Sequence, residues 1–181
     1  LAALAGQPYP LPAEGAVLRI LVLGGSLGAR IFADVVPAAI GALPEALRAR
    51  LLVTQQCRAE DLARTRSAYD SAGVPADLAP FFPDVAGRLA TAHLVIGRAG
   101  ASTVAEIACA GRPSVLVPLP SAIDDHQTAN ARALAAADAA QVFAQADFTP
   151  QALTDALVSF LNFPARMASA AAAAAALARP H

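Results

Sequence analysis

Short apolar runs alternate with amphipathic stretches along most of the chain. The first run covers residues 17–23 and stops at Gly24-Gly25, a pattern typical of a strand buried on both faces. Residues 29–42 follow with apolar side chains at helical spacing. The same alternation predicts further strands at residues 51–53, 78–81, 94–96, 114–117 and 141–143. It predicts further helices at 59–72, after Asp84, at 102–110, from Asp124 or Asp125 to 137, from Thr149-Pro150 to 161, and over the alanine-rich residues 165–178.

Strands that alternate with helices of this length form a parallel sheet covered on both faces. We therefore predict an α/β, Rossmann-like fold with a parallel sheet of about six strands. Residues 1–15, rich in proline and glycine, are predicted to be a linker, residues 16–163 a single ligand-binding domain, and residues 164–181 a C-terminal helix or tail. Ligands of such sheets bind beyond the carboxyl ends of the strands, so the loops that leave the strands are the candidate site.

Composition narrows the class of protein. A net charge of −1 gives no basic surface for nucleic acid, and no apolar run reaches the roughly 20 residues of a membrane span. Charged residues make up only 15% of the chain, which indicates that part of the surface meets another domain or a partner. Cys57 and Cys109 lack metal-type spacing and are predicted to be buried free thiols, in keeping with a reducing cytoplasm.

The loop after the first strand has the composition of a phosphate-binding turn. Gly24, Gly25 and Gly28 let the backbone approach a ligand, Ser26 adds a hydroxyl, and the helix that follows offers unpaired N–H groups. A plain strand-to-helix turn is the alternative. A dinucleotide fold would carry an acidic residue after the second strand, and residues 53–56 contain none, which disfavours NAD.

The loop after the fourth strand, residues 97–106, is a second candidate anion site. Small residues expose backbone amides at a helix start, and Arg98 lies at the strand end. Glu106 could accept hydrogen bonds from a ribose diol. The alternative is structural: Thr103 and Glu106 match the spacing of a capping box.

The segment 118–130 carries uncharged hydrogen-bonding groups. Gln127 and Asn130 are three residues apart and share a helix face, where their amides suit sugar hydroxyls. An ordinary capped helix is the alternative, and His126 is given no catalytic role. Taken together, the three loops predict a site for a nucleoside diphosphate that carries a sugar.

At residues 24–30, 98–106 and 125–131 the sequence resembles the MurG family of bacterial GT-B glycosyltransferases, which add N-acetylglucosamine from UDP-GlcNAc to lipid I to form lipid II in peptidoglycan synthesis. The resemblance runs from residue 17 onward and covers only the C-terminal, donor-binding half of that two-domain enzyme. It implies that Glu106 binds the ribose, Ala101 and Ser102 the α-phosphate, Ser26 the second phosphate, and Gln127 and Asn130 the GlcNAc hydroxyls, with Arg98 near the nucleotide and main-chain atoms at Phe82 near uracil.

The resemblance also implies what lies elsewhere. The N-terminal domain of the family supplies the lipid I site, the general base and the membrane-facing patch, so we assign no catalytic residue, no metal and no cofactor to this chain. The full-length protein would be cytoplasmic and peripheral on the inner membrane, and the isolated chain would be inactive. Two alternatives remain: a donor-binding subunit of a split glycosyltransferase, and an NAD(P)-binding Rossmann domain.

Overall fold

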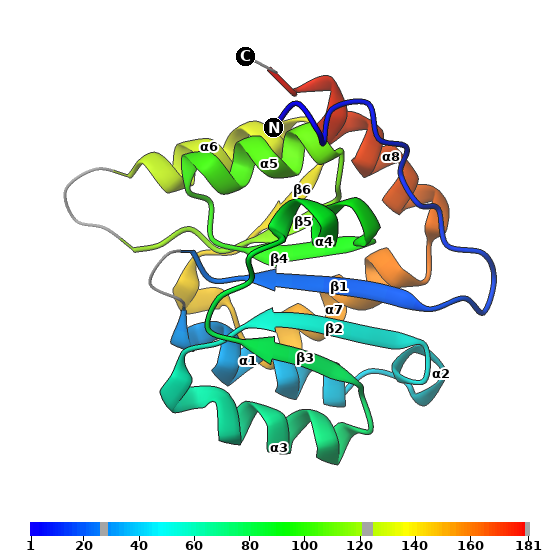
Figure 1. Ribbon diagram of the computed structural model, residues 1–181, viewed down its shortest axis with the longest axis vertical. Helices are drawn as coiled ribbons and strands as arrows, with labels where there is room; N and C mark the ends of the chain where they lie inside the picture. Colours follow the sequence, from blue (N-terminus) through cyan, green and yellow to red (C-terminus); the bar gives the residue numbers. More distant parts are fainter. Residues whose placement is uncertain (26–28, 121–124, 180–181) are drawn as a thin grey trace.

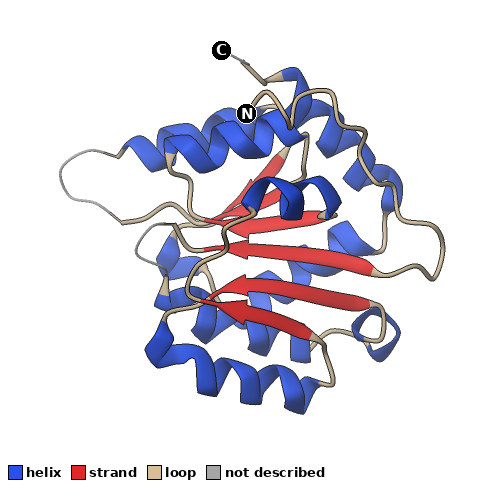
Figure 2. Cartoon of the chain, in the orientation of Figure 1, coloured by secondary structure: helices blue, strands red, loops and turns tan. Residues whose placement is uncertain are grey.

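The computed structural model describes residues 1–25, 29–120 and 125–179 and contains a six-stranded, fully parallel sheet (Figures 1 and 2). Its strand order is β3-β2-β1-β4-β5-β6, which confirms the predicted doubly wound α/β class. The strands are β1 (Leu18–Leu23), β2 (Leu51–Gln56), β3 (Ala76–Ala79), β4 (Leu94–Gly97), β5 (Ser114–Leu116) and β6 (Ala140–Val142).

The central strands divide their side chains between two cores. On β1, Ile20 and Val22 join one buried cluster, while Leu21 and Leu23 join the other. Val95 and Ile96 on β4 alternate in the same way. This explains the nearly continuous apolar runs in the sequence, because each face of the sheet is covered by helices.

Helices cover the two faces in separate layers (Figure 1). The first core lies between the sheet and α1 (Arg30–Gly41), α3 (Leu62–Ala72) and α7 (Pro150–Leu161). The second lies between the sheet and α4 (Val85–Thr91), α5 (Ala101–Ala110) and α6 (His126–Ala136). The remaining α-helices are the short α2 (Glu45–Arg48) and α8 (Pro164–Ala176), and η1 (Ala59–Asp61) and η2 (Gln145–Asp147) are 3-10 turns.

The helix α8 contacts both layers. It packs against α5 and α7, with Met167 in the first core and Ala174 in the second. Its small side chains allow a close approach to Gly111, where an added Cβ would lie 3.1 Å from the Cβ of Ala175. Gly111 also has φ +66°, a left-handed conformation that ends α5 and favours glycine.

The first 17 residues form no helix or strand, yet they pack on the domain. Leu4 is buried in the second core, and the Tyr9 hydroxyl donates a 2.8 Å hydrogen bond to the His93 carbonyl. Arg112, fully buried, lies under the Tyr9 ring at 5.5 Å from its centroid. Its guanidinium donates to carbonyls of Leu89, Ala90, Ala110 and Gly111 and thereby satisfies the C-terminal ends of α4 and α5.

Most predicted helix ends are confirmed. Asp84, Asp125 and Thr149 accept the capping hydrogen bonds of α4, α6 and α7, and both cysteines are free and buried. The third strand is earlier than predicted, at Ala76–Ala79, because Pro80 lacks the N–H that would continue the ladder. The short helix α2 was not predicted, since four residues are too few to show a helical period.

Candidate functional site

The strand order reverses between β1 and β4, and a cavity of about 630 Å³ opens there at the carboxyl ends of the strands. The loops after β1 and β4 form two of its walls, as predicted for this class of sheet. Its lining comprises Gly24, Gly25, Ala29, Arg30, Ile31, Arg58, Arg98, Gly100, Ala101, Ser102, Thr103, Leu119, Gln127 and Gln145.

The lining gives the cavity a positive potential. The described residues that line it include three arginines and no acidic side chain. The helices α1 and α5 both begin at its edge, and neither start has a side-chain cap, so their first amides are available to an anion. These features together suit a phosphate or diphosphate group.

The glycine loop after β1 is held in place by Gln56. The Gln56 side chain accepts a hydrogen bond from the Gly24 amide at 3.0 Å and donates to the carbonyls of Gly25 at 2.9 Å and Pro80 at 3.2 Å. Gly25 has φ +83°, which explains the need for glycine there. Predicted contacts of Ser26 and Gly28 lie outside the described residues.

Arg98 lines the cavity, but its guanidinium mainly holds neighbouring loops together. It is 9% exposed, and its terminal nitrogens donate to the carbonyls of Val117 and Pro118 and, at 2.7 Å, to Oε1 of Gln145. Burial lowers the pKa of its guanidinium from the usual value. Arg98 therefore fixes the segments that follow β4, β5 and β6 relative to one another. Its positive charge acts on the cavity from a nearly buried position.

Gln127 and Asn130 meet at the backbone of Ala99, which precedes α5. Oε1 of Gln127 accepts hydrogen bonds from the amides of Ala99 at 3.2 Å and Leu119 at 2.9 Å. Nδ2 of Asn130 donates to the Ala99 carbonyl at 3.0 Å. The shared helix face is thus confirmed, and the two amides have a second role that sequence reasoning missed: they hold the loop whose amides face the cavity.

Glu106 is available at the surface of α5. The capping-box alternative is wrong, because α5 begins at Ala101 with Gly100 as its N-cap, which places Thr103 and Glu106 inside the helix. Glu106 instead accepts a 3.1 Å hydrogen bond from the hydroxyl of Ser102, one turn earlier. The exposed pair leaves the second carboxylate oxygen able to accept from a ligand.

Phe82 lies in the connection from β3 to α4. Its side chain is buried, and the guanidinium of Arg88 stacks on it at 4.2 Å from the ring centroid. The neighbouring Phe81 is 73% exposed, a feature that sequence reasoning did not single out. A large exposed aromatic beside a buried one is a candidate platform for a planar base.

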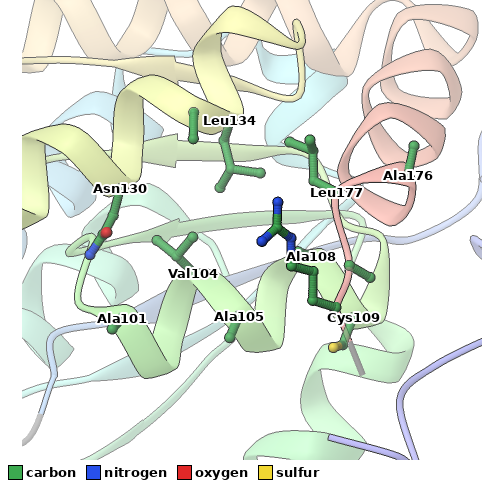
Figure 3. A pocket seen from close by; sticks show the side chains of 12 residues that line it. Ala101, Val104, Ala105, Ala108, Cys109, Asn130, Leu134, Ala176 and Leu177 are labelled. Atoms are coloured by element: carbon green, nitrogen blue, oxygen red, sulfur yellow. The ribbon is translucent and has the colours of Figure 1, made fainter. Parts of the chain in front are cut away.

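A second cavity, of about 540 Å³, lies between α5, α6 and the end of α8 (Figure 3). Asn130 and Ala101 stand at one end of it, and Cys109 and Ala176 at the other. Its wall is mostly alanine, leucine and valine. It offers few groups for chemistry, so the charged cavity is the candidate site.

Sequence reasoning missed Arg30, Arg58, Gln56 and Gln145. A signal for Gln56 was present, since it stands at the end of β2, where dinucleotide folds place an acid. Within the described ranges, no three histidine, cysteine or acidic side chains gather as metal ligands. Over the same ranges no helix has both the length and the apolarity to cross a membrane.

The fold and the cavity define a doubly wound α/β domain with a candidate anion-binding site at the carboxyl ends of its strands. The comparisons give its family: residues 19–180 match the glycosyltransferase family 28 C-terminal domain, and the chain belongs to this family. A crystal structure of Acinetobacter baumannii MurG shares its fold at TM-score 0.83 and 37% identity, covering 91% of this chain and 49% of that one. WaaG, a glycosyltransferase involved in lipopolysaccharide biosynthesis, is similar in fold at TM-score 0.67 and 22% identity, covering 96% of this chain and 43% of that one.

Curated relatives are more similar in sequence. A protein of Granulibacter bethesdensis is 58% identical over 177 residues, which are 98% of this chain and 46% of that protein. One of Rhodospirillum centenum is 57% identical over 178 residues, or 98% of this chain and 47% of that protein. Both are named UDP-N-acetylglucosamine–N-acetylmuramyl-(pentapeptide) pyrophosphoryl-undecaprenol N-acetylglucosamine transferase. The chain spans about half the length of these curated relatives.

Proposed function

We propose that this chain is the UDP-GlcNAc-binding half of an inverting transferase that adds N-acetylglucosamine to lipid I, the N-acetylmuramyl-(pentapeptide) pyrophosphoryl-undecaprenol of the relatives' names, to give lipid II for peptidoglycan. The observation that carries the proposal is the positively charged cavity between the uncapped starts of α1 and α5. It matches the chemistry of a sugar-linked diphosphate, and the 58% identical relative takes such a donor by name.

The donor would lie across the carboxyl edge of the sheet. Its diphosphate would meet the amides of Ala101 and Ser102 and the hydroxyl of Ser26, with Arg98 adding charge. Glu106 would accept from the ribose diol. The uracil would reach the backbone at Phe82, and the exposed ring of Phe81 is well suited to stack on it.

The sugar would lie near Gln127 and Asn130. Each amide uses one end to hold the loop at Ala99. The other ends, Nε2 of Gln127 and Oδ1 of Asn130, would serve the GlcNAc hydroxyls. The same two side chains would therefore bind the sugar and position the amides that bind the phosphates.

Catalysis by these residues would be electrostatic. The acceptor hydroxyl displaces UDP at the anomeric carbon in one step, and negative charge grows on the leaving diphosphate. Fixed amides and helix dipoles stabilise that charge without reorganisation, which lowers the barrier. The general base, the acceptor site and the contact with the cytoplasmic face of the inner membrane would belong to the other half of the full-length protein.

One observation weighs against NAD(P). The end of β2 carries Gln56, whose side chain is fully engaged with Gly24, Gly25 and Pro80. A ribose-binding acid is therefore missing from the position where dinucleotide folds need it. A donor-binding subunit of a split transferase would use the same cavity and differs only in how the other half is encoded.

Calorimetry with UDP-GlcNAc, UDP and NAD tests the proposal. We expect UDP and UDP-GlcNAc to bind and NAD to fail. Glu106→Gln should weaken UDP binding about 10-fold or more, since a hydrogen bond to a charged group contributes about 1.5–3 kcal/mol. Glu45→Gln on α2 makes the same charge change at the opposite edge of the sheet and should leave UDP affinity unchanged. No UDP binding at millimolar concentration would overturn the proposal.

A further inference from the structure

Arg30 and Arg58 line the cavity, and neither is among the residues proposed above to bind UDP-GlcNAc. Arg30 is the first residue of α1, and Arg58 follows β2 and precedes η1. Because β2 lies on the side of β1 opposite β4, Arg58 stands across the cavity from Gly100 and Ser102 at the start of α5.

Arg30 is held by a buried carboxylate. Its Nε lies 3.7 Å from Oδ1 of Asp61, and its side chain is 64% exposed while that of Asp61 is 2% exposed. The same oxygen accepts a 3.0 Å hydrogen bond from Nε of Arg64, and Oδ2 of Asp61 has no hydrogen-bond partner among the described residues. An under-satisfied buried carboxylate attracts the adjacent guanidinium, so Asp61 anchors the inner edge of Arg30 and leaves its outer edge toward the cavity.

Arg98, the third arginine of the cavity, does not present its guanidinium to a ligand in the way that Arg30 does. The terminal nitrogens of Arg98 already donate to Val117, Pro118 and Gln145, and the side chain is nearly buried. The exposed guanidinium of Arg30 is therefore the group that can form a new two-pronged contact with phosphate oxygens. Among the described residues that line the cavity, none is acidic.

The reaction in the relatives' names brings together two substrates that each carry a diphosphate: UDP-N-acetylglucosamine and a pyrophosphoryl-undecaprenol sugar. During transfer, only the width of the acceptor sugar separates the acceptor's pyrophosphate from the reacting donor. The two diphosphates lie on opposite sides of the anomeric carbon, and positive groups beside each of them lower the repulsion between them. In the donor arrangement proposed above, the amides of α5 and the loop after β1 meet the donor diphosphate, and Arg30 and Arg58 remain for the other.

We propose that Arg30 and Arg58 form a second anion subsite that binds the pyrophosphate of the lipid-linked acceptor, with Asp61 as the positioning residue for Arg30. The inference rests on the proposed function, because it places the donor diphosphate in the α5 half of the same cavity. It assigns part of acceptor recognition to this chain rather than to the other half of the enzyme alone.

Inorganic pyrophosphate is the probe for a binding test on the chain itself. Calorimetry without divalent cations would titrate pyrophosphate into the chain saturated with UDP. We expect pyrophosphate to bind without displacing UDP. Arg30→Gln and Arg58→Gln should each weaken it about 10-fold and change UDP affinity less than 2-fold. Arg66→Gln is the matched control, since this exposed arginine on α3 lines neither cavity described above.

The positioning role of Asp61 has its own readout. Asp61→Asn should weaken pyrophosphate binding several-fold in the wild-type background. It should cause no further loss of pyrophosphate affinity in the Arg30→Gln background. Asp34→Asn is the control, because Asp34 pairs with Arg64 at 2.8 Å and not with Arg30. Additive losses from Asp61→Asn and Arg30→Gln would overturn this role, and thermal melts of each variant report any loss of folded protein.

The outcomes separate the two proposals. Failure of the wild-type chain to bind UDP overturns the proposed function. UDP binding with no pyrophosphate binding, or with strict competition between the two, overturns only the second subsite. A parallel loss of UDP and pyrophosphate affinity in Arg30→Gln assigns that arginine to the donor instead.

Kinetics of a complete enzyme identify the source of the anion. The chain would be joined to the amino-terminal half of the Granulibacter bethesdensis relative. We expect Arg30→Gln and Arg58→Gln to raise KM for the lipid-linked acceptor about 10-fold and to leave KM for UDP-GlcNAc unchanged. An unchanged acceptor KM with weakened pyrophosphate binding would mean a site for free pyrophosphate only, and would overturn the acceptor assignment.

Discussion

The side chain of Asn130 donates a 3.0 Å hydrogen bond to the carbonyl of Ala99. This contact ties α6 to the short loop that leads into α5, and Gln127 holds the amide of the same residue. The loop therefore has its position fixed from α6. Its placement determines where the first amides of α5 point, which is the basis of the first prediction.

Asn130→Ala should weaken UDP binding about 5-fold, because the loop is displaced. It should weaken UDP-GlcNAc binding by a larger factor, because the sugar also loses its contact with Oδ1. The lost hydrogen bond should also lower the free energy of unfolding by about 1 kcal/mol. Calorimetry and thermal melts measure both effects. Asn162→Ala, at the exposed end of α7, is the control. Unchanged UDP affinity would contradict the loop-holding role.

Gln56→Glu should impair the glycine loop. The carboxylate cannot donate to the carbonyls of Gly25 and Pro80 and faces them with like partial charge. It also brings a negative charge to the cavity edge. We expect UDP affinity to fall more than 10-fold and the free energy of unfolding to fall by about 1–2 kcal/mol. Gln7→Glu, an exposed change of the same kind, should do neither; equal effects in the two variants would refute the assignment.

Arg112→Met should be strongly destabilising. It leaves four carbonyls at the ends of α4 and α5 without their donor, and three of these hydrogen bonds are buried. A loss of about 3 kcal/mol is expected from such groups. Arg66→Met on the surface gives the baseline for chemical denaturation. A loss below about 1 kcal/mol would show that the carbonyls find other partners.

His93 predicts a dependence of stability on pH. Burial lowers the pKa of its imidazole from the usual 6.5, and Nδ1 accepts a 2.8 Å hydrogen bond from the Arg19 amide, which requires the neutral ring. The unfolded chain therefore binds the proton more readily. The stabilisation is complete above about pH 6.5 and declines as the pH falls from there toward the folded pKa, with a slope of at most about 1.4 kcal/mol per pH unit.

Denaturation curves between pH 7.5 and 5 measure that slope. His93→Asn keeps an acceptor for the Arg19 amide and removes the titration, so its free energy of unfolding should vary less over this window. Asn162→Ala, at the exposed end of α7, is the control and should retain the wild-type slope. A wild-type slope in His93→Asn would assign the effect to other groups.

Local patterns were sufficient for the fold because β1 and β4 are apolar on both faces and several helices have a clear start or end. Asp84 and Thr149 were identified as caps from residue type and position alone, and Asp125 was one of two candidates with Asp124. The irregular first 17 residues were different. Proline and glycine led to the prediction of a linker at residues 1–15, whereas the burial of Leu4 depends on partners distant in sequence.

For the candidate site too, local features could be predicted from the sequence and long-range contacts could not. The three loops could be predicted from glycines, helix starts and the rule for parallel sheets. The roles within them depend on distances across the sheet, as with Arg98, which sequence places at a strand end and the fold turns toward Gln145, 47 residues later. Asp61 could not be found at all from sequence, since its significance lies in being buried beside an exposed Arg30.

The helix α8 has a consequence for how the molecule comes apart. Its Met167 belongs to the core beneath α1 and α7, and its Ala174 to the core beneath α4 and α5. Detaching it would open both halves of the interior to water in one event. We therefore expect the two layers to unfold in one transition, with equal protection for the slowest-exchanging amides of the helices on the two sides of the sheet.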